Sequence, residues 1–356
     1  MTDLRELLET EVKSGAVPGA AALVARRDQI EIAGAGEVTA DSIVRIASIT
    51  KPITAAAVMV LVDDGILALG DPIARWTPEL GSPVVVRARE SPIDDVVPAT
   101  RPITVEDLLT FRAGWGFPSD FSLPAVVELF ERLPVFGVQE TPDEWLATLA
   151  RVPMLGQPGE AWLYNTCSDI QGVLIARASG QPLPEFLTER IFAPLGMDDT
   201  GFHVPAEKLD RLPAFHAPDL TPIDDGVSTS PPIFPSGAGG LVSTLADWHR
   251  FAAMMLAEGG GILSHESVRL MSTDHLTQEQ RDASTLFLEG DGWGFGGSVA
   301  ADGRYGWVGG TGTTAHLVPS TGTIGVLLTQ VQMAGPTPTP VMRRFWQYAF
   351  GTAAGR

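Results

Sequence analysis

The sequence predicts an α+β fold in which one antiparallel β-sheet is built from both ends of the chain. Segments of strand type lie near both termini, in residues 20–36 and 292–329, and the segments between them have helical spacing. Amphipathic helices at the two ends are expected to flank the sheet. We therefore expect an α/β domain of residues 1–75 and 280–356, and a mostly helical domain of residues 76–279 that carries active-site loops.

The first elements are bounded by clear start and stop signals. Residues 2–14 predict an amphipathic helix that is capped by Thr2 or Asp3 and ends at Gly15. Two strands, residues 20–27 and 29–36, follow it with a tight turn between them. A nearly continuous apolar run then begins after Ser48 and ends at Asp63-Asp64-Gly65, which is typical of a helix buried on all sides.

The rest of the chain is helical in the middle and strand-like toward its end. Residues 72–104 are expected to be irregular, and Thr104-x-x-Asp107 then opens a helix with a capping-box pattern. Further helices are predicted over residues 141–152, 166–179, 182–195, 243–258 and 264–275. Strands are predicted over residues 292–300, 304–308, 313–318 and 323–329, followed by a final helix over residues 340–353.

Composition excludes several classes of function. The net charge of −19 over 356 residues repels phosphates, which argues against nucleic acid and anionic membranes as partners. The single cysteine excludes an internal disulfide, and we see neither a signal peptide nor an apolar run of 18 residues, so we expect a cytoplasmic protein. The six histidines are scattered and nucleotide-binding motifs are absent, so no metal or cofactor is expected.

Ser48 and Lys51 form the first candidate for chemistry. They lie three residues apart at the start of the apolar helix, and Lys51 is one of only three lysines in the chain. A desolvated lysine can take the proton of a serine hydroxyl and make it a nucleophile, because burial and a helix N-terminus both lower the pKa of the ammonium. The alternative is a serine that caps the helix beside a surface lysine.

Two further segments could complete such a site. Tyr164 lies in a turn just before a predicted helix, where its phenol could relay a proton between serine and leaving group, or simply pack its ring at a rim. The segment from Gly306 to Thr313 lies between two predicted strands. Its glycines either let the backbone approach a ligand and donate to an oxyanion, or form an ordinary hairpin turn.

Taken together, these segments resemble the serine β-lactamase-like, penicillin-recognising hydrolases, and most of all the class C-like branch that includes the family VIII carboxylesterases. Residues 46–52, 103–114, 192–202 and 235–247 extend the similarity in the expected order along nearly the whole chain. The resemblance implies a β-lactamase/transpeptidase-like fold. It also implies that Ser48 is the acylated nucleophile, Lys51 its base and Tyr164 the proton shuttle.

The resemblance also assigns the surroundings of the nucleophile. The oxyanion hole would be the backbone N–H groups of Ser48 and Gly310. The run Trp307-Val308-Gly309 takes the place of the third family motif, so Trp307 and Gly309 would contact substrate. Thr166 takes the third position of the second motif, and Asn165 beside it is expected to point elsewhere.

Two departures from the lactamase pattern favour a neutral ester as substrate. Trp307 stands where lactamases and peptidases of this family carry the Lys or His that holds a substrate carboxylate, and loss of such a charge-assisted bond weakens binding about 10- to 150-fold. Thr166 replaces the asparagine whose amide contacts the acylamide of a β-lactam. Trp-x-Gly at this place is what the esterase branch shows.

Residues 111–140 form a long aromatic insertion that includes Trp115 and Phe136. It could be a wall of the acyl or alcohol pocket, with Trp115 in contact with substrate, or the small core of the helical lobe.

The predicted function is a serine carboxylesterase that hydrolyses small carboxylic esters through an acyl-enzyme. The alternatives are an acyltransferase, a β-lactamase or D-amino-acid peptidase, and a binding or sensor module that keeps the fold.

Overall fold

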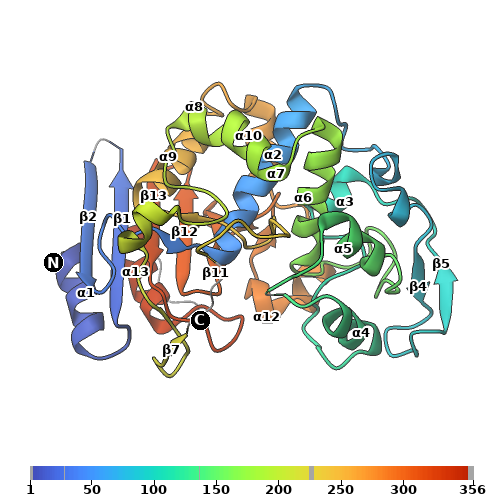
Figure 1. Cartoon of the computed structure of the whole chain (residues 1–356), viewed down its shortest axis with the longest axis horizontal. Coiled ribbons are helices and arrows are strands. Elements are labelled where there is room, and N and C mark those ends of the chain that lie inside the picture. The colour runs from blue at the N-terminus through green and yellow to red at the C-terminus, as the bar shows by residue number, and fades with distance from the viewer. Residues whose placement is uncertain (1–2, 28, 136, 224–227, 352–356) are drawn as a thin grey trace.

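The protein is organised around a seven-stranded antiparallel sheet to which both ends of the chain contribute (Figure 1). The computed structural model describes residues 3–27, 29–135, 137–223 and 228–351. The strand order is β2-β1-β13-β12-β11-β10-β9, which confirms the predicted α+β class. The strands are β1 (Gly19–Arg26), β2 (Gln29–Gly36), β9 (Gly292–Trp293), β10 (Ser298–Val299), β11 (Tyr305–Gly309), β12 (Thr313–Val318) and β13 (Thr323–Leu328).

Helices from the two ends of the chain pack on this sheet as predicted. Helix α1 (Leu4–Lys13) contacts β1 and β2, and α13 (Pro340–Phe350) contacts β13. Asp3 caps α1, because its carboxylate accepts a hydrogen bond from the backbone N–H of Glu6 at 2.7 Å. The last three residues of the predicted C-terminal helix include Gly351, which ends α13 in a left-handed conformation, and residues 352–353 lie outside the described residues.

Helix α2 (Lys51–Asp63) is the central element between the two lobes. It lies between the sheet and α6 (Thr166–Ser179), and its residues from Lys51 to Leu61 are all buried (Figure 1). The run of alanine and valine explains this, because small apolar side chains on every side let a helix be covered on every side. A short 3₁₀ turn, η1 (Ala47–Thr50), precedes α2, so the helix proper begins at Lys51 rather than near Ser48.

Most of the other helices follow the sequence signals, but those over residues 124–132, 278–283 and 285–288 were not predicted. Thr104 and Asp107 form the predicted capping box, and Thr141 forms a second one with Glu144. The remaining helices are α3 (Val105–Leu109), α4 (Pro124–Arg132), α5 (Pro142–Leu149), α7 (Leu183–Leu187), α8 (Ala193–Leu195), α9 (Leu245–Leu256), α10 (His265–Met271), α11 (Gln278–Ala283) and α12 (Thr285–Leu288), with the helical turns η2 (Ile73–Arg75), η3 (Pro78–Leu80), η4 (Thr188–Phe192) and η5 (Ala206–Arg211).

Three small hairpins or strand pairs stand apart from the main sheet. The segment expected to be irregular contains one of them, formed by β4 and β5. The pairs are β3 (Val44–Arg45) with β8 (Val242–Ser243), β4 (Val84–Val86) with β5 (Val96–Pro98), and β6 (Phe215–His216) with β7 (Pro222–Ile223).

The prediction of one strand over residues 292–300 was wrong. The segment folds back on itself, and β9 and β10 pair with each other. Gly296 makes this turn possible, because its φ is +76° and a Cβ there would lie 2.5 Å from the carbonyl oxygen of Lys51. The turn therefore packs against the start of α2.

The sheet is also covered by a helix from the middle of the chain. Helix α9 belongs to the segment assigned to the helical domain, but it packs against β1, β12 and β13. One contiguous apolar cluster extends from α1 through the sheet and α2 into the helical lobe. The two lobes therefore share a core.

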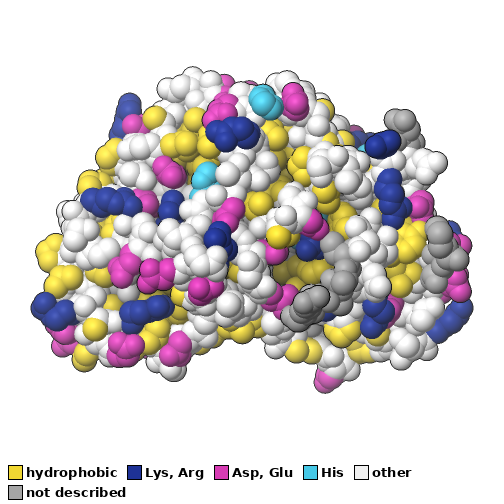
Figure 2. All heavy atoms as spheres, turned by 180° about the vertical axis from the view of Figure 1, so that it is seen from behind, with side chains coloured by type: hydrophobic (Ala, Val, Ile, Leu, Met, Phe, Trp, Pro, Cys, Tyr) yellow, Lys and Arg dark blue, Asp and Glu magenta, His cyan; other side chains and the backbone are white. Residues whose placement is uncertain are grey.

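The surface mixes charges of both signs. Acidic and basic side chains are interspersed over the face shown in Figure 2. Among the helices that the structure describes, none combines the length and the apolar character needed to cross a bilayer.

Candidate active site

A strained turn presents Ser48 at the surface of a pocket. The residue before it, Ala47, has a φ of 46°, which is in the left-handed region that residues with a Cβ rarely adopt. Such backbone conformations cost about 1–3 kcal/mol and tend to occur at functional sites. Ala47 is buried and Ser48 is half-buried, so the turn directs the serine hydroxyl outward while the chain on either side stays in the core.

The Lys51 ammonium is fully buried one turn after Ser48 and has three acceptors. Its Nζ lies 2.9 Å from Oγ of Ser48, 2.8 Å from Oδ1 of Asn165 and 2.7 Å from the carbonyl oxygen of Ala238. As an ammonium it donates to all three. As a neutral amine it donates to Asn165 and Ala238, and its lone pair faces the hydroxyl proton of Ser48. The geometry therefore suits proton abstraction from Ser48.

Burial also tunes the basicity of Lys51. Removal of the ammonium from water lowers its pKa to about 7, while the negative charge of Asp169 acts in the opposite direction. A lysine with a pKa near 7 is a neutral base in a large fraction of molecules at neutral pH.

Tyr164 completes the polar cluster on the other side of Ser48. The Ser48 hydroxyl lies close enough to the phenol to lower its pKa, and Nζ of Lys51 lies 4.6 Å from the centre of its ring. Burial raises the pKa of Tyr164 to about 12, so the phenol keeps its proton over the usual pH range. The backbone of Phe117 fixes Tyr164 by exchanging two hydrogen bonds with it, at 2.9 and 3.0 Å.

Trp307 on β11 touches the same phenol. Its indole N–H donates to the hydroxyl oxygen of Tyr164 at 2.7 Å, so the one polar group of Trp307 is used within the protein. When Lys51 is neutral, the donors can all be oriented the same way. The Trp307 N–H donates to Tyr164, the Tyr164 hydroxyl can donate to Ser48, and the Ser48 hydroxyl can donate to Lys51. Trp293 packs edge-on against Trp307, and Phe287 packs on Tyr164.

Asn165 is a site residue that the sequence reasoning missed. We expected its side chain to point elsewhere, but the backbone at Asn165 has φ 81° and ψ −66°, which turns the side chain toward Lys51. Asparagine tolerates positive φ better than most residues, and this is the signal that could have identified it. Thr166 begins α6 and is buried beside it.

Gly309 and Gly310 at the end of β11 have different roles. A Cβ on Gly309 would lie 2.1 Å from Oγ1 of Thr313 and 2.5 Å from the carbonyl oxygen of Ile46, so Gly309 lets the strand pack against the Ser48 turn. A Cβ on Gly310 would meet no atom within 4 Å, and Gly310 lines the pocket together with Ser48.

The pocket in front of Ser48 has a volume of about 440 Å³ and is lined by uncharged residues. Two groups of residues form its outer walls, Val135 with residues 137–139, and residues 228–240. Val135 and Ile233 are partly exposed on these walls, with 36% and 53% of their surface accessible. Within the described part of the lining there is no Lys, Arg, His, Asp or Glu.

Trp115 does not contact this pocket, which corrects the expectation that it binds substrate. It is 2% exposed, and its indole N–H donates to the carbonyl oxygen of Val152 at 2.8 Å. The other described aromatic residues of the insertion pack together, with Phe117 and Phe130 stacked at 4.6 Å. The described part of the insertion is therefore mainly core, and near its C-terminal end Val135 and residues 137–139 are pocket wall. Phe136 lies outside the described residues.

Metal binding has no support in the described chain, since no three His, Cys, Asp or Glu side chains there form a group that could hold an ion. Burial raises the pKa of the Cys167 thiol to about 12, which leaves it unreactive.

Comparisons with known proteins agree with this geometry. The family profile described as Beta-lactamase matches residues 4–341. Protein Rv1367c of Mycobacterium tuberculosis is 38% identical to this chain, over 92% of this chain and 88% of that protein. Esterase EstB of Burkholderia gladioli is 30% identical, over 72% of this chain and 66% of EstB.

Solved structures show the same fold. EstCE1, described as a hydrolase with promiscuous acyltransferase activity, superposes with a TM-score of 0.82 over 97% of both chains at 21% identity. A mutant of the simvastatin synthase LovD from Aspergillus terreus superposes with a TM-score of 0.79, over 97% of this chain and 92% of that one, at 22% identity.

Proposed function

The chain belongs to the beta-lactamase family, and from this premise we propose that it is a carboxylesterase that acts on neutral esters through an acyl-enzyme at Ser48. The family contains serine hydrolases with esterase and acyltransferase members. One observation carries the proposal: Trp307 occupies the third-motif position, and its only polar group is bonded to Tyr164. Neither Trp307 nor the described pocket lining offers a cation to a substrate carboxylate.

In the proposed acylation, Oγ of Ser48 attacks the ester carbonyl carbon and its proton passes to Nζ of Lys51. The carbonyl oxygen becomes an oxyanion that accepts from the N–H groups of Ser48 and Gly310. When the tetrahedral intermediate collapses, the bond to the alcohol oxygen breaks. Tyr164 gives its phenolic proton to that oxygen and regains a proton directly from the Lys51 ammonium, which lies over its ring, because the acylated Oγ of Ser48 has no proton to relay. Water then attacks the acyl-enzyme by the same steps in reverse order.

The contacts of Tyr164 favour this role. A phenol that keeps its proton up to about pH 12 cannot be the general base at neutral pH, but it can pass on a proton that Lys51 resupplies. The indole N–H of Trp307 stabilises the negative charge that develops on the phenol oxygen during the transfer.

An acyltransferase is the second candidate, because the partly exposed Val135 and Ile233 leave apolar walls on which an acceptor alcohol could lie. On the same site the acceptor would replace water in the second step.

Turnover of p-nitrophenyl acetate and butyrate, measured beside nitrocefin, tests the proposal. We expect an initial burst with the esters, little hydrolysis of nitrocefin, and loss of turnover in Ser48→Ala. Ser42→Ala is the matched control, because Ser42 lies nearby and contacts Thr39 instead of the site. Wild-type protein that hydrolyses none of the short-chain esters would refute the esterase, and nitrocefin turnover at a comparable rate would show that Trp307 does not exclude lactams. Product analysis with added alcohol distinguishes transfer from hydrolysis.

A further inference from the structure

The carbonyl group that binds Lys51 belongs to a short loop, residues 236–240, that comes from the segment before β8. Ala238 accepts from Nζ of Lys51 at 2.7 Å, so the position of this carbonyl helps to fix the base. A shift of this loop would move one of the three acceptors that orient the Lys51 amine.

Asp169 on α6 holds this loop in place. Its Oδ1 accepts from the hydroxyl of Ser236 at 2.6 Å and from the backbone N–H of Ala238 at 3.1 Å. The Ser236 oxygen in turn accepts from the N–H groups of Ala238 and Gly239, both at 3.2 Å. Two hydrogen bonds thus connect Asp169 to Lys51. The N–H of Ala238 donates to Asp169, and Lys51 donates to the carbonyl oxygen of Ala238.

The loop is also clamped from two other directions. Thr54 on α2 donates to the carbonyl oxygen of Gly237 at 2.7 Å. A Cβ on Gly237 would lie 2.4 Å from the carbonyl oxygen of Ser168, so the loop lies directly on α6. These contacts hold the loop against both α2 and α6.

Asp169 also acts on Lys51 by charge. Its carboxylate favours the ammonium form of Lys51, against the effect of burial. Among the described residues, the Tyr164 phenol also contacts Lys51, and it stays neutral. Asp169 borders a second cavity of about 280 Å³, behind the loop, whose walls include Gly172, Val173 and Phe234. Burial raises the pKa of the Asp169 carboxyl, while the hydrogen bond from Ser236, the charge of Lys51 and the N–H of Ala238 favour its charged form.

We propose that Asp169 is a positioning residue for the catalytic base. It places Lys51 through the loop at residues 236–238, and its charge sets the pH at which Lys51 becomes a neutral amine. This inference rests on the proposed function of Lys51 and extends it to a residue outside the substrate pocket.

Two substitutions separate placement from charge. Asp169→Asn keeps an oxygen that can accept from Ser236 and Ala238 but removes the charge. We expect its maximal kcat to stay within about threefold of wild type, and the acid limb of its pH–rate profile to move about one pH unit lower, because the Lys51 ammonium loses its stabilising charge. Asp169→Ala also removes the acceptor, and we expect its maximal kcat to fall at least about tenfold.

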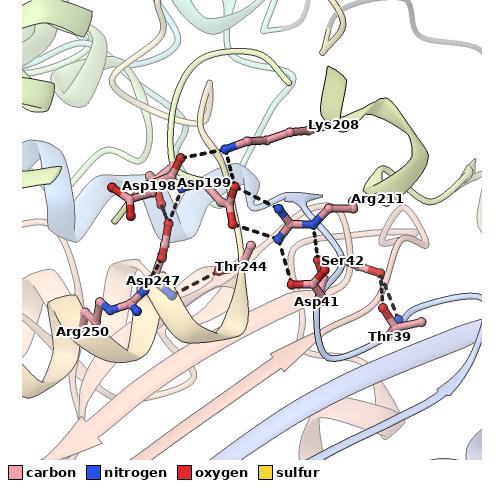
Figure 3. A network of polar contacts seen from close by, with 11 residues as sticks. Thr39, Asp41, Ser42, Asp198, Asp199, Lys208, Arg211, Thr244, Asp247 and Arg250 are labelled. Carbon is pink, nitrogen blue, oxygen red and sulfur yellow. Dashed lines mark hydrogen bonds and ion pairs between the residues drawn. The ribbon is translucent and has the colours of Figure 1, made fainter. Parts of the chain in front are cut away.

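Asp247 on α9 provides a matched control. It is a buried carboxylate whose Oδ2 likewise accepts from a backbone N–H, that of Asp199 at 2.8 Å, and from the hydroxyl of Thr200 at 3.0 Å (Figure 3). It belongs to a network of ion pairs that includes Arg250 and does not contact Lys51. We expect Asp247→Asn to lower Tm while the acid limb stays where it is in wild type.

A second readout keeps the inference independent of the ester substrate. The rate at which a fluorophosphonate labels Ser48 depends on the same base, so its pH profile can be measured even if no ester is turned over. Failure of ester turnover with a normal labelling profile would count against the proposed function alone. If folded Asp169→Asn shows the wild-type acid limb in labelling, the charge effect is refuted, and if folded Asp169→Ala labels Ser48 at the wild-type rate, the positioning role is refuted.

Ser236→Ala covers the case in which neither Asp169 variant folds. It removes the hydroxyl that bridges Asp169 to the loop but leaves both charges. We expect slower labelling of Ser48 with an unchanged acid limb, and a labelling rate equal to that of wild type would refute the inference.

Discussion

At the residue scale, the site depends on how a few polar groups share hydrogens in a buried space. Lys51 has three donors and three acceptors when it is charged, and it can lose a proton without leaving any donor unused. Such balance matters because an unpaired buried polar group costs about 1–3 kcal/mol. The cluster can therefore change its protonation state during a reaction without rearranging.

The burial of Lys51 predicts a pH-dependent stability. Its pKa is about 7 in the folded protein and about 10.4 when unfolded, so between these values the unfolded chain binds one more proton. The free energy of unfolding should therefore rise with pH in wild type relative to Lys51→Met, by about 1.4 kcal/mol per pH unit between roughly pH 7.5 and 9.5. Urea titrations at several pH values measure this difference.

Lys13→Met is the control for that experiment. The Lys13 side chain is 75% exposed on α1, and we expect its substitution to leave the slope unchanged. Parallel curves for wild type and Lys51→Met over this range would contradict a buried lysine with a lowered pKa.

The bond from Trp307 to Tyr164 predicts a specific kinetic defect. Trp307→Phe keeps a ring against Trp293 but removes the N–H that stabilises charge on the phenol. One lost hydrogen bond of about 1.4 kcal/mol corresponds to about a tenfold lower kcat. Steady-state kinetics with p-nitrophenyl butyrate measure this effect, and KM should change much less.

Trp346→Phe is the comparison for that variant. Trp346 lies on α13, and its indole N–H donates to Oγ1 of Thr314 at 3.0 Å. Its loss should affect Tm and leave kcat unchanged. Equal kcat values for Trp307→Phe and wild type would mean that the indole N–H plays no part in proton transfer.

At the scale of elements, the site depends on the close approach of β11 to the turn before α2. Gly309 allows this approach, and the strained backbone at Ala47 aims Ser48 along it. Both features come from pairs of segments that are far apart in sequence and are held together by the sheet and by α2. The site is therefore as rigid as the core on which it is built.

Two neighbouring glycines test this dependence. Gly309→Ala places a Cβ against backbone and the Thr313 hydroxyl, so we expect a loss of about 1–3 kcal/mol in stability and a marked loss of kcat. Gly310→Ala adds its methyl group in open space and should fold like wild type. Chemical unfolding curves and ester kinetics measure both effects. A Gly309→Ala protein as stable as wild type would show that the strand can move away from the turn.

At the scale of the whole molecule, charge and pocket composition point to the same substrates. The net charge of −19 disfavours anions over the whole surface, and the described lining of the pocket holds no cation to compensate. Acidic and basic groups are interspersed over the face visible in Figure 2.

A pair of p-nitrophenyl esters matched in size, one neutral and one with a carboxylate on its acyl chain, tests this combination. We expect kcat/KM to be about 10- to 150-fold lower for the anion, because nothing in the described pocket replaces the water that it loses. Added salt should narrow the difference by screening the overall charge. Equal kcat/KM for the two esters would reveal a cation near the acyl chain.

Local features of the sequence predicted most of the elements and the proximity of Ser48 and Lys51. Ser48 and Lys51 are three residues apart, so a single helical turn brings them together, and the capping box at Thr104 and the bounds of α6 likewise depend on neighbours in sequence. The order of the segments also predicted the sheet built from both termini.

Tertiary structure alone decided which of the remaining groups belong to the site. Trp307 and Tyr164 are 143 residues apart, and Lys51 and Asn165 are 114 apart, so their hydrogen bonds depend on how β11, α2 and α6 pack. For the same reason Trp115 proved to be core, and residues 292–300 proved to be a hairpin around Gly296. A motif specifies side chains near each other in sequence, whereas the partner of a buried polar group is set by the packing of the whole core.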